Sequence, residues 1–116
     1  MSGAPDPDEL LELLGDEYVR SILVATSRRP QSVKELSDEF GVAQSTIYRR
    51  LDEMVDHRLL EEQTELVADG SHHSVYKAKL THLDVVVADG ELRIEMDYDE
   101  SAAERFTRIW GDIRRQ

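Results

Sequence analysis

Four polar side chains between positions 44 and 49 have the types and the spacing needed to hydrogen-bond the edges of DNA bases. Residues three and four apart share one face of a helix, so Ser45, Tyr48 and Arg49 point the same way if this stretch is helical. Arg49 has the forked donors that pair with guanine, and Gln44 has the donor and the acceptor that pair with adenine. Gln44, Ser45, Tyr48 and Arg49 are therefore our candidates for reading bases in the DNA major groove.

A helix-turn-helix pattern surrounds these side chains over residues 32–58. Ser32, followed three residues later by Glu35, forms a capping box that marks the start of a first helix. Gly41 ends that helix, because glycine takes the left-handed conformation without steric cost. A second helix with one apolar stripe is expected to begin near Ala43. The second helix of such a pair commonly enters the major groove.

A β-hairpin is expected directly after this pair of helices. Residues 59–68 and 73–81 flank Asp69-Gly70-Ser71-His72, which is a hairpin turn signal. A hairpin in this position is the wing of a winged helix, and its tip usually reaches the DNA backbone.

A second hairpin is expected around the two-residue turn Asp89-Gly90. Counting outward from this turn places Asp84 opposite Glu95, a like-charge pair whose repulsion salt would relieve. The returning strand alternates between apolar and charged residues from Leu92 to Tyr98. This alternation predicts that one face of the hairpin is buried.

The two ends of the chain are expected to add a helical lead-in and a closing helix. Asp8-Glu9 opens a leucine-rich turn, and Asp16 is placed to cap the helix that follows. A last helix from about Ser101 to Arg115 carries an apolar seam with spacing three, four, three. We expect this seam to form a dimer interface in preference to packing on its own core; its residues are Ala103, Phe106, Trp110 and Ile113.

These elements predict an α+β fold. It is a winged helix-turn-helix with a three-helix core and a β-hairpin wing, an extra β-hairpin and a C-terminal dimerisation helix. Residues 1–7 are expected to be a flexible tail, residues 8–98 the DNA-binding domain with its second hairpin, and residues 99–116 the C-terminal helix.

The charge of the chain is unusual for a DNA-binding protein. Its 25 acidic residues against 14 basic ones give a net charge of −11, and only three of the basic residues are lysine. Phosphate affinity comes from lysine and arginine, so this balance by itself argues against nucleic acid. An acidic, lysine-poor composition is typical of proteins from salt-loving archaea, in which concentrated salt screens self-repulsion. The alternative is a mesophilic acidic protein with a basic partner.

The distribution of the charge favours DNA more than its sum does. Residues 18–34, 40–51 and 70–83 contain no acid, yet they hold eight of the 14 basic residues. In a winged helix these windows are the lead-in, the turn with the front of the second helix, and the wing, which together face DNA. The expected phosphate contacts, drawn mostly from these windows, are Arg28, Arg29, Lys34, Thr46, Arg50, His72, His73, Lys77 and Lys79.

Other function classes are excluded or disfavoured by the composition. The chain has no cysteine, which excludes disulfides, thiol catalysis and thiolate metal sites. His72 and His73 are adjacent, so in a strand they point to opposite faces and rarely bind one metal ion. No apolar run reaches membrane-spanning length and no signal peptide opens the chain, so we expect a cytoplasmic protein without a membrane partner. No nucleophile motif or glycine-rich phosphate loop is present, and we expect no enzyme.

Three stretches resemble the ArsR-like winged helix-turn-helix regulators of halophilic archaea. Leu14 to Leu23 (LGDEYVRSIL) looks like their opening helix, Val33 to Leu51 (VKELSDEFGVAQSTIYRRL) like their motif, and Asp69 to Lys79 (DGSHHSVYKAK) like their wing. The resemblance covers roughly residues 10–98 and implies a homodimeric transcription regulator. The DNA contacts that it implies are Gln44, Ser45, Thr46, Tyr48, Arg49 and Arg50.

The chain departs from this family in two ways. Ala43 stands where such motifs usually place a serine or aspartate cap, so the second helix is expected to start later or to be capped by Ser45. The cysteine-rich metal sites of the name-giving sensors are absent, so their effector chemistry is not carried over.

The sequence therefore predicts a sequence-specific transcription regulator that binds double-stranded DNA as a homodimer and is adapted to high salt. A protein in molar salt cannot rely on counterion release alone, so acids such as Asp52, Asp56 or Asp69 are expected to hold K⁺ or Na⁺ ions that bridge to phosphate. No other cofactor is expected. The alternatives are a winged-helix protein-interaction module that does not bind DNA, and a ligand- or metal-responsive sensor variant whose effector the sequence does not identify.

Overall fold

The computed structural model describes residues 6–66 and 68–98 of the chain. The expected C-terminal helix, with its seam of Ala103, Phe106, Trp110 and Ile113, lies outside these residues, as do residues 1–5 of the expected tail. The described part contains four helices and two antiparallel hairpins. This is the α+β winged helix-turn-helix architecture that the sequence predicts, with the extra hairpin in place.

Two capped helices form the lead-in. Helix α1 (Pro7–Leu14) begins after Asp6, whose carboxylate accepts a hydrogen bond from the N–H group of Asp8 at 3.0 Å. The first helix therefore starts one residue before the expected domain boundary at residue 8. Helix α2 (Glu17–Arg28) begins after Asp16, which caps it as predicted.

The central pair of helices has the expected start and turn. In front of helix α3 (Val33–Phe40), the Ser32 hydroxyl accepts from the N–H group of Glu35 at 3.1 Å, and the Glu35 carboxylate accepts from the N–H group of Ser32 at 2.9 Å. This reciprocal pair is the predicted capping box. Gly41 then takes a φ of 67°, which allows the sharp turn into helix α4 (Gln44–Asp56).

Helix α4 begins without a side-chain cap. Its first residue is Gln44, and Ala43 at the N-cap has no side chain that accepts a hydrogen bond. The structure thus shows neither the later start nor the Ser45 cap that the sequence suggested. The N–H groups of Thr46 and Ile47 donate to the Ala43 carbonyl oxygen, at 3.1 and 3.4 Å.

A single apolar core fixes the orientation of α4. Ile47, Leu51 and Met54 are fully buried along one side of this helix, against Leu36 of α3 and Ile22 of α2. Because these residues recur at helical spacing, the opposite side of α4 must face outward. The packing therefore presents the predicted reading residues to solvent.

The wing is the hairpin of β1 (Leu60–Leu66) and β2 (His72–Ala78), paired as antiparallel strands. It is attached to the helices by an element that the sequence did not indicate. Gln31, between α2 and α3, forms an isolated antiparallel bridge with Tyr76, through N–H to oxygen bonds of 3.0 and 2.8 Å. The Gln31 side chain is also buried and donates to the Ala25 carbonyl at 2.8 Å, which fixes the base of the wing on α2.

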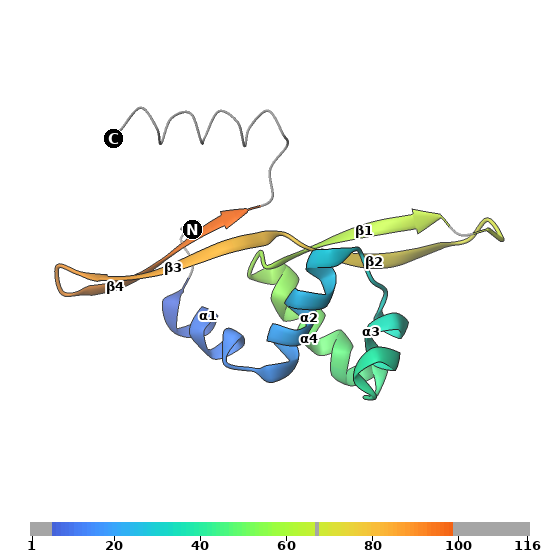
Figure 1. Ribbon diagram of the computed structural model, residues 1–116, viewed down its shortest axis with the longest axis horizontal. Coiled ribbons are helices and arrows are strands. Elements are labelled where there is room, and N and C mark those ends of the chain that lie inside the picture. The colour runs from blue at the N-terminus through green and yellow to red at the C-terminus, as the bar shows by residue number, and fades with distance from the viewer. Residues whose placement is uncertain (1–5, 67, 99–116) are drawn as a thin grey trace, which may run out of the picture.

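The second hairpin consists of β3 (Leu80–Ala88) and β4 (Glu91–Tyr98). Asp89 and Gly90 have φ values of 55° and 76°, as a two-residue hairpin turn with two positive φ angles requires. The predicted register is confirmed, including the like-charge pair of Asp84 and Glu95. Figure 1 shows the two hairpins extending in opposite directions above the helices, with the wing on the right and β3–β4 on the left.

The prediction of one buried hairpin face holds only for the inner half of β3–β4. Ile94 is buried, and Leu83 and Met96 are partly buried against the core. On the same face nearer the turn, however, large apolar side chains are exposed. The physical reason is length: α1, which contacts β4, has eight residues and is about 12 Å long, whereas the eight residues of β4 extend about 27 Å.

Within residues 6–66 and 68–98, none of the helices has the length and apolar character that crossing a membrane requires.

Candidate nucleic-acid interface

The outward side of α4 carries the four residues predicted to read bases. Gln44, Ser45, Tyr48 and Arg49 are all exposed. Across the described part of the chain, none of their side chains has a hydrogen-bond or ion-pair partner. Side chains without an internal partner keep all their donors and acceptors available for a ligand.

A groove between α3, α4 and the wing brings several predicted contacts together. It is a hollow of about 580 Å³. Its lining includes Lys34, Gln44 and Tyr48 on the helix side, His73 and Ser74 on the wing side, and the carboxylates Glu35, Asp38 and Glu65. Tyr76 anchors this region below the surface, where burial raises the pKa of its phenol to about 12, and it therefore stays neutral. The groove joins residues of the helix pair α3–α4 with residues of the wing, which is distant from them in the sequence.

Arg49, also on the outward side of α4, does not line this groove. It borders a separate cavity of about 300 Å³ between α1, α2 and α4, which is also lined by the carboxylates Glu9, Glu12, Asp16 and Glu53. Arg49 makes no ion pair with any of these within the described residues. Arg50 and His57 line the same cavity and pair with Asp16 and Glu9. Glu12 and Glu53 are the carboxylates that would repel DNA phosphate if the exposed Arg49 were removed.

Arg50 is not available for the phosphate contact that the sequence predicted. Its guanidinium Nη2 lies 3.0 Å from Asp16 Oδ2, Nε lies 3.1 Å from both carboxylate oxygens, and the group stacks 5.0 Å from the centre of the Tyr18 ring. The side chain of Arg50 is only 19% exposed. The pair lowers the pKa of Asp16, chiefly through the hydrogen bond from Arg50, and raises the pKa of Arg50. The residue fastens α4 to the start of α2.

Two other predicted phosphate contacts are exposed but already carry a carboxylate partner. Arg29 Nη1 lies 3.0 Å from Glu35 Oε2, and Lys34 Nζ lies 3.0 Å from Asp38 Oδ2. Arg28 is exposed and has no such partner in the described part of the chain. Exposed pairs of this kind are weak, so Arg29 and Lys34 can exchange a carboxylate for a phosphate at small cost.

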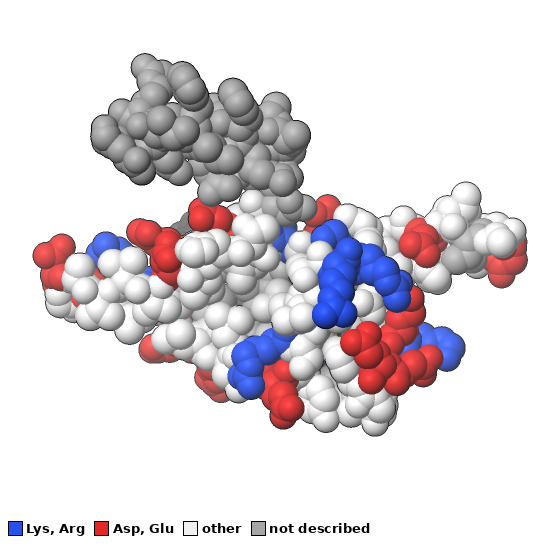
Figure 2. Space-filling view, viewed as in Figure 1, with Lys and Arg blue, Asp and Glu red and all other residues white. Residues whose placement is uncertain are grey.

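The wing differs most from its predicted role. Lys77 and Lys79 lie at its inner end: Lys77 Nζ donates to the Ser27 carbonyl at 3.2 Å, and Lys79 Nζ lies 5.6 Å from the centre of the Tyr98 ring. The outer part of the wing has histidines and acids instead. His73 Nε2 lies 3.2 Å from Glu65 Oε1, whereas His72 has no partner among the described residues. Figure 2 shows red and white but no blue at the wing end on the visible face.

The acid-free windows of the sequence are thus not acid-free in space. Carboxylates from neighbouring segments lie against the basic residues of all three windows, and in Figure 2 red atoms border the main blue group. In the wing, β1 places Glu61 opposite Lys77. The three windows therefore do not form an acid-free face, because neighbouring strands and helices bring carboxylates next to their basic residues.

The structure also contains contacts that the sequence analysis missed. His57 at the end of α4 lies 2.8 Å from the Glu53 carbonyl oxygen through Nδ1, and 3.2 Å from Glu9 Oε2 through Nε2. Both ring nitrogens face acceptors, which favours the doubly protonated ring. The pKa of His57 is accordingly raised, first by the Glu53 carbonyl and then by Glu9. In its protonated form at the C-terminus of α4, it joins this helix to α1 through Glu9.

This contact predicts a pH dependence of stability. Because the pKa of His57 is raised above its ordinary value of 6.5 in the folded state, the stabilisation is complete below about pH 6.5 and is lost as the pH rises through the raised value. His57→Ala should therefore cost about 0.5 kcal/mol at pH 5.5 and almost nothing at pH 8.5, measured by urea unfolding. His72→Ala, which removes an exposed histidine without a partner, is the control and should not change the pH profile.

No cluster of three or more metal-binding side chains occurs among residues 6–66 and 68–98. Asp69, at the wing turn next to His72 and His73, accepts from the N–H group and hydroxyl of Ser71, at 2.9 and 2.6 Å. These two bonds lower the pKa of Asp69 and hold the wing turn.

Comparison with known proteins supports the same fold. Residues 14–63 match a protein family described as Helix-turn-helix domain, and this span runs from the end of α1 to the first strand of the wing. No curated protein matches the chain. The match and the architecture together support a DNA-binding regulator of the winged helix-turn-helix type, in which α4 is the second helix of the motif.

Proposed function

We propose that the chain is a transcription regulator that reads double-stranded DNA in a sequence-specific manner as a homodimer, in the salt-rich cytoplasm of a halophile. The observation that carries the DNA-reading part is the outward side of α4, where Gln44, Ser45, Tyr48 and Arg49 are exposed without internal partners. The matched Helix-turn-helix domain supports the same assignment. The composition, with its net charge of −11, supports the high-salt part.

In the proposed mode of binding, α4 enters the major groove and the wing lies along the neighbouring backbone. Arg49 and Gln44 are suited to guanine and adenine edges, respectively. Lys34 and His73, on opposite walls of the groove, are suited to phosphate. Two copies, joined through the C-terminal seam of Ala103, Phe106, Trp110 and Ile113, would place two α4 helices in successive major grooves about 34 Å apart.

The ion pairs on this surface lead to a specific proposal about salt. When Arg29 or Lys34 leaves its carboxylate for a phosphate, Glu35 or Asp38 loses its cationic partner and takes up a K⁺ or Na⁺ ion. Cation uptake by the protein then offsets cation release from the DNA. Cations bound to carboxylates can also bridge to phosphate. We expect Asp52, Asp56 and Asp69 to hold bridging cations in this way.

This mechanism predicts a shallow salt dependence. A dimer with about eight conventional phosphate contacts would show a slope of log K against log salt near −7. We expect a slope of less than about half that magnitude for this protein, measured by fluorescence anisotropy over a tenfold range of KCl concentration. A slope near −7 would show that its cationic groups bind DNA without carboxylate-bound ions and would contradict the bridging proposal.

Selection from a random double-stranded DNA library in molar KCl tests the function itself. The proposed regulator should enrich one near-palindromic sequence, and the promoter of its own gene is the first natural fragment to try. The protein-interaction alternative is favoured by the carboxylate partners of Arg29, Lys34 and Arg50, which reduce the free positive charge. That alternative predicts no enrichment at any salt concentration.

A further inference from the structure

The outer half of the β3–β4 hairpin has an uncovered apolar face. Val85, Val87 and Leu92 are exposed to 48%, 76% and 41%, and they share their face with the buried Ile94. Val87 pairs directly with Leu92, and Val85 pairs with Ile94, so the side chains form one continuous patch. Single exposed apolar residues are ordinary on a protein surface, but a contiguous patch on a projecting hairpin indicates a contact surface.

The charge around this patch restricts what covers it. Residues 80–98 carry five acids and one arginine, so the hairpin is strongly negative. Asp84 and Glu95 lie opposite each other on the back of the patch, and Asp89 and Glu91 lie at the turn. Two such hairpins placed face to face would repel each other. The charge favours an apolar segment with basic residues as the occupant.

The chain itself contains such a segment, and it lies outside the described residues. Residues 101–116 carry four arginines and two acids, in contrast to the acidic remainder of the chain. Their apolar residues follow the helical spacing of the C-terminal seam. As a helix, the stretch from Ala103 to Ile113 would span about 15 Å. The hairpin face from Leu83 to Val87 spans about 14 Å, which matches it.

We propose that residues 101–116 of a second copy of the chain pack on the outer apolar face of β3–β4, and that the two copies exchange these segments reciprocally. This inference rests on the homodimer part of the proposed function. A reciprocal exchange is closed by a two-fold axis and stops at two copies. Each copy then offers one basic apolar segment and receives one, so both acidic hairpin faces are covered.

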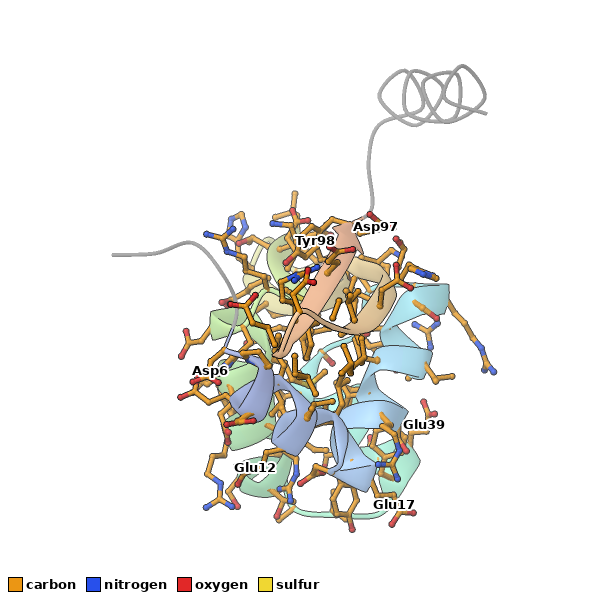
Figure 3. The ribbon with its side chains drawn as sticks, turned by 90° about the vertical axis from the view of Figure 1, so that its left-hand side faces the viewer. Asp6, Glu12, Glu17, Glu39, Asp97 and Tyr98 are labelled. Carbon is orange, nitrogen blue, oxygen red and sulfur yellow. The ribbon has the colours of Figure 1, made fainter. Side chains whose placement is uncertain are left out.

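The place where the chain leaves β4 favours a second copy over the chain's own segment. Tyr98 is at the inner end of the strand, whereas Val87 and Leu92 are next to the turn at the outer end. Figure 3, seen from the hairpin side of Figure 1, places Asp97 and Tyr98 at the top of the molecule above α1. To cover the patch near the turn, the chain's own segment would have to reverse direction directly after Tyr98 and run back along the hairpin.

Cross-linking between two single-cysteine variants of the full chain tests this exchange without background, because the chain has no cysteine. Val87→Cys and Ala103→Cys are mixed in molar KCl until subunits exchange, and then treated with a short bis-maleimide. The expected product has twice the chain mass of 13.3 kDa and appears in the mixture in clear excess over either protein alone. Val24→Cys, at an apolar position on α2 that is 57% exposed, replaces Val87→Cys in the control and should give no product.

Each of the other results would overturn the proposal. Product from Val87→Cys alone would mean that two hairpins meet. In a chain that carries both Val87→Cys and Ala103→Cys, linkage within one chain would mean that the segment covers its own hairpin. No linkage in any arrangement would mean that the segment does not cover the patch. Trp110 is the only tryptophan, so its emission gives a second measurement: it should shift to longer wavelength in Val87→Lys but not in Val24→Lys.

DNA binding by the same variants separates this inference from the proposed function. If the protein sediments as a dimer and binds DNA but gives no cross-links, the segment exchange is wrong and the regulator proposal stands. If the wild-type chain is a monomer and enriches no DNA sequence, the proposed function itself fails.

Discussion

Replacing Arg50 with methionine should lower the free energy of unfolding by about 2 kcal/mol. Exposed ion pairs contribute about 0.2–1 kcal/mol, and breaking a fully buried one costs about 3–5 kcal/mol. The side chains of Arg50 and Asp16 are 19% and 31% exposed, so this pair lies between the two limits. The loss leaves Asp16 partly buried without its charge partner and removes the guanidinium from the face of Tyr18. Chemical denaturation at neutral pH measures the effect.

Arg49→Met is the matched control for this prediction, because it makes the same change one residue away at a side chain without an ion-pair partner in the described chain. It should change stability by less than about 0.5 kcal/mol. Asp16→Asn combined with Arg50→Met should cost less than the sum of the single changes, because both remove one interaction. Equal stability of Arg50→Met and Arg49→Met would show that the pair does not fasten α4 to α2.

The ion pair of Asp16 and Arg50 also makes the free energy of unfolding depend on pH in the acid range. Arg50 holds the pKa of Asp16 below its ordinary value of 3.8, so the contribution is fully present above that value and is lost as the pH falls through the lowered pKa. Arg50→Met should remove this part of the acid profile. If the wild type and Arg50→Met lose the same free energy of unfolding below pH 4, the ion pair does not cause this pH dependence.

The local structure of this chain could be predicted from its sequence because the signals are local. Ser32 and Glu35 are three residues apart and fix the start of α3, and Gly41 fixes its end. Asp89 and Gly90 fix the register of the second hairpin. In each case the physical cause, a cap or a positive φ, lies within a few residues of the element that it controls.

The pairing of charged side chains could not be predicted in the same way. Asp16 and Arg50 are 34 residues apart, and nothing next to either residue marks the other as its partner. Arg50 and Arg49 are adjacent in the sequence, yet the turn of the helix directs one to α2 and leaves the other exposed. Windows counted along the chain cannot describe a face to which several segments contribute.

The prediction that one whole face of the second hairpin is buried failed for a related reason. The alternation along β4 correctly identifies which side is apolar, but how much of that side is covered depends on the length of α1 beneath it. Ile94 lies above the helical layer and is buried, whereas Leu92, two residues nearer the turn, is exposed. The pattern defines a face, and only the packing partner defines its covered extent.

Replacing Arg49 with alanine should weaken binding to the selected DNA sequence by about 10- to 100-fold and reduce its preference over a scrambled duplex. A lost bidentate contact to a base costs about 1–3 kcal/mol. The cavity beside Arg49 adds to the loss, because Glu12 and Glu53 then face the phosphates without the charge of Arg49 between them. Fluorescence anisotropy with both duplexes in molar KCl separates the loss of affinity from the loss of preference.

Arg93→Ala makes the same substitution on the β3–β4 hairpin, at an exposed arginine paired with Glu91. In the proposed mode of binding this hairpin extends away from the wing, so the control should bind both duplexes as the wild type does. Circular dichroism establishes that both variants are folded. Equal affinity of Arg49→Ala and Arg93→Ala for the selected sequence would mean that the exposed side of α4 does not read DNA. The same surface, with its unpartnered Tyr48 and Gln44, would then be a contact for another protein.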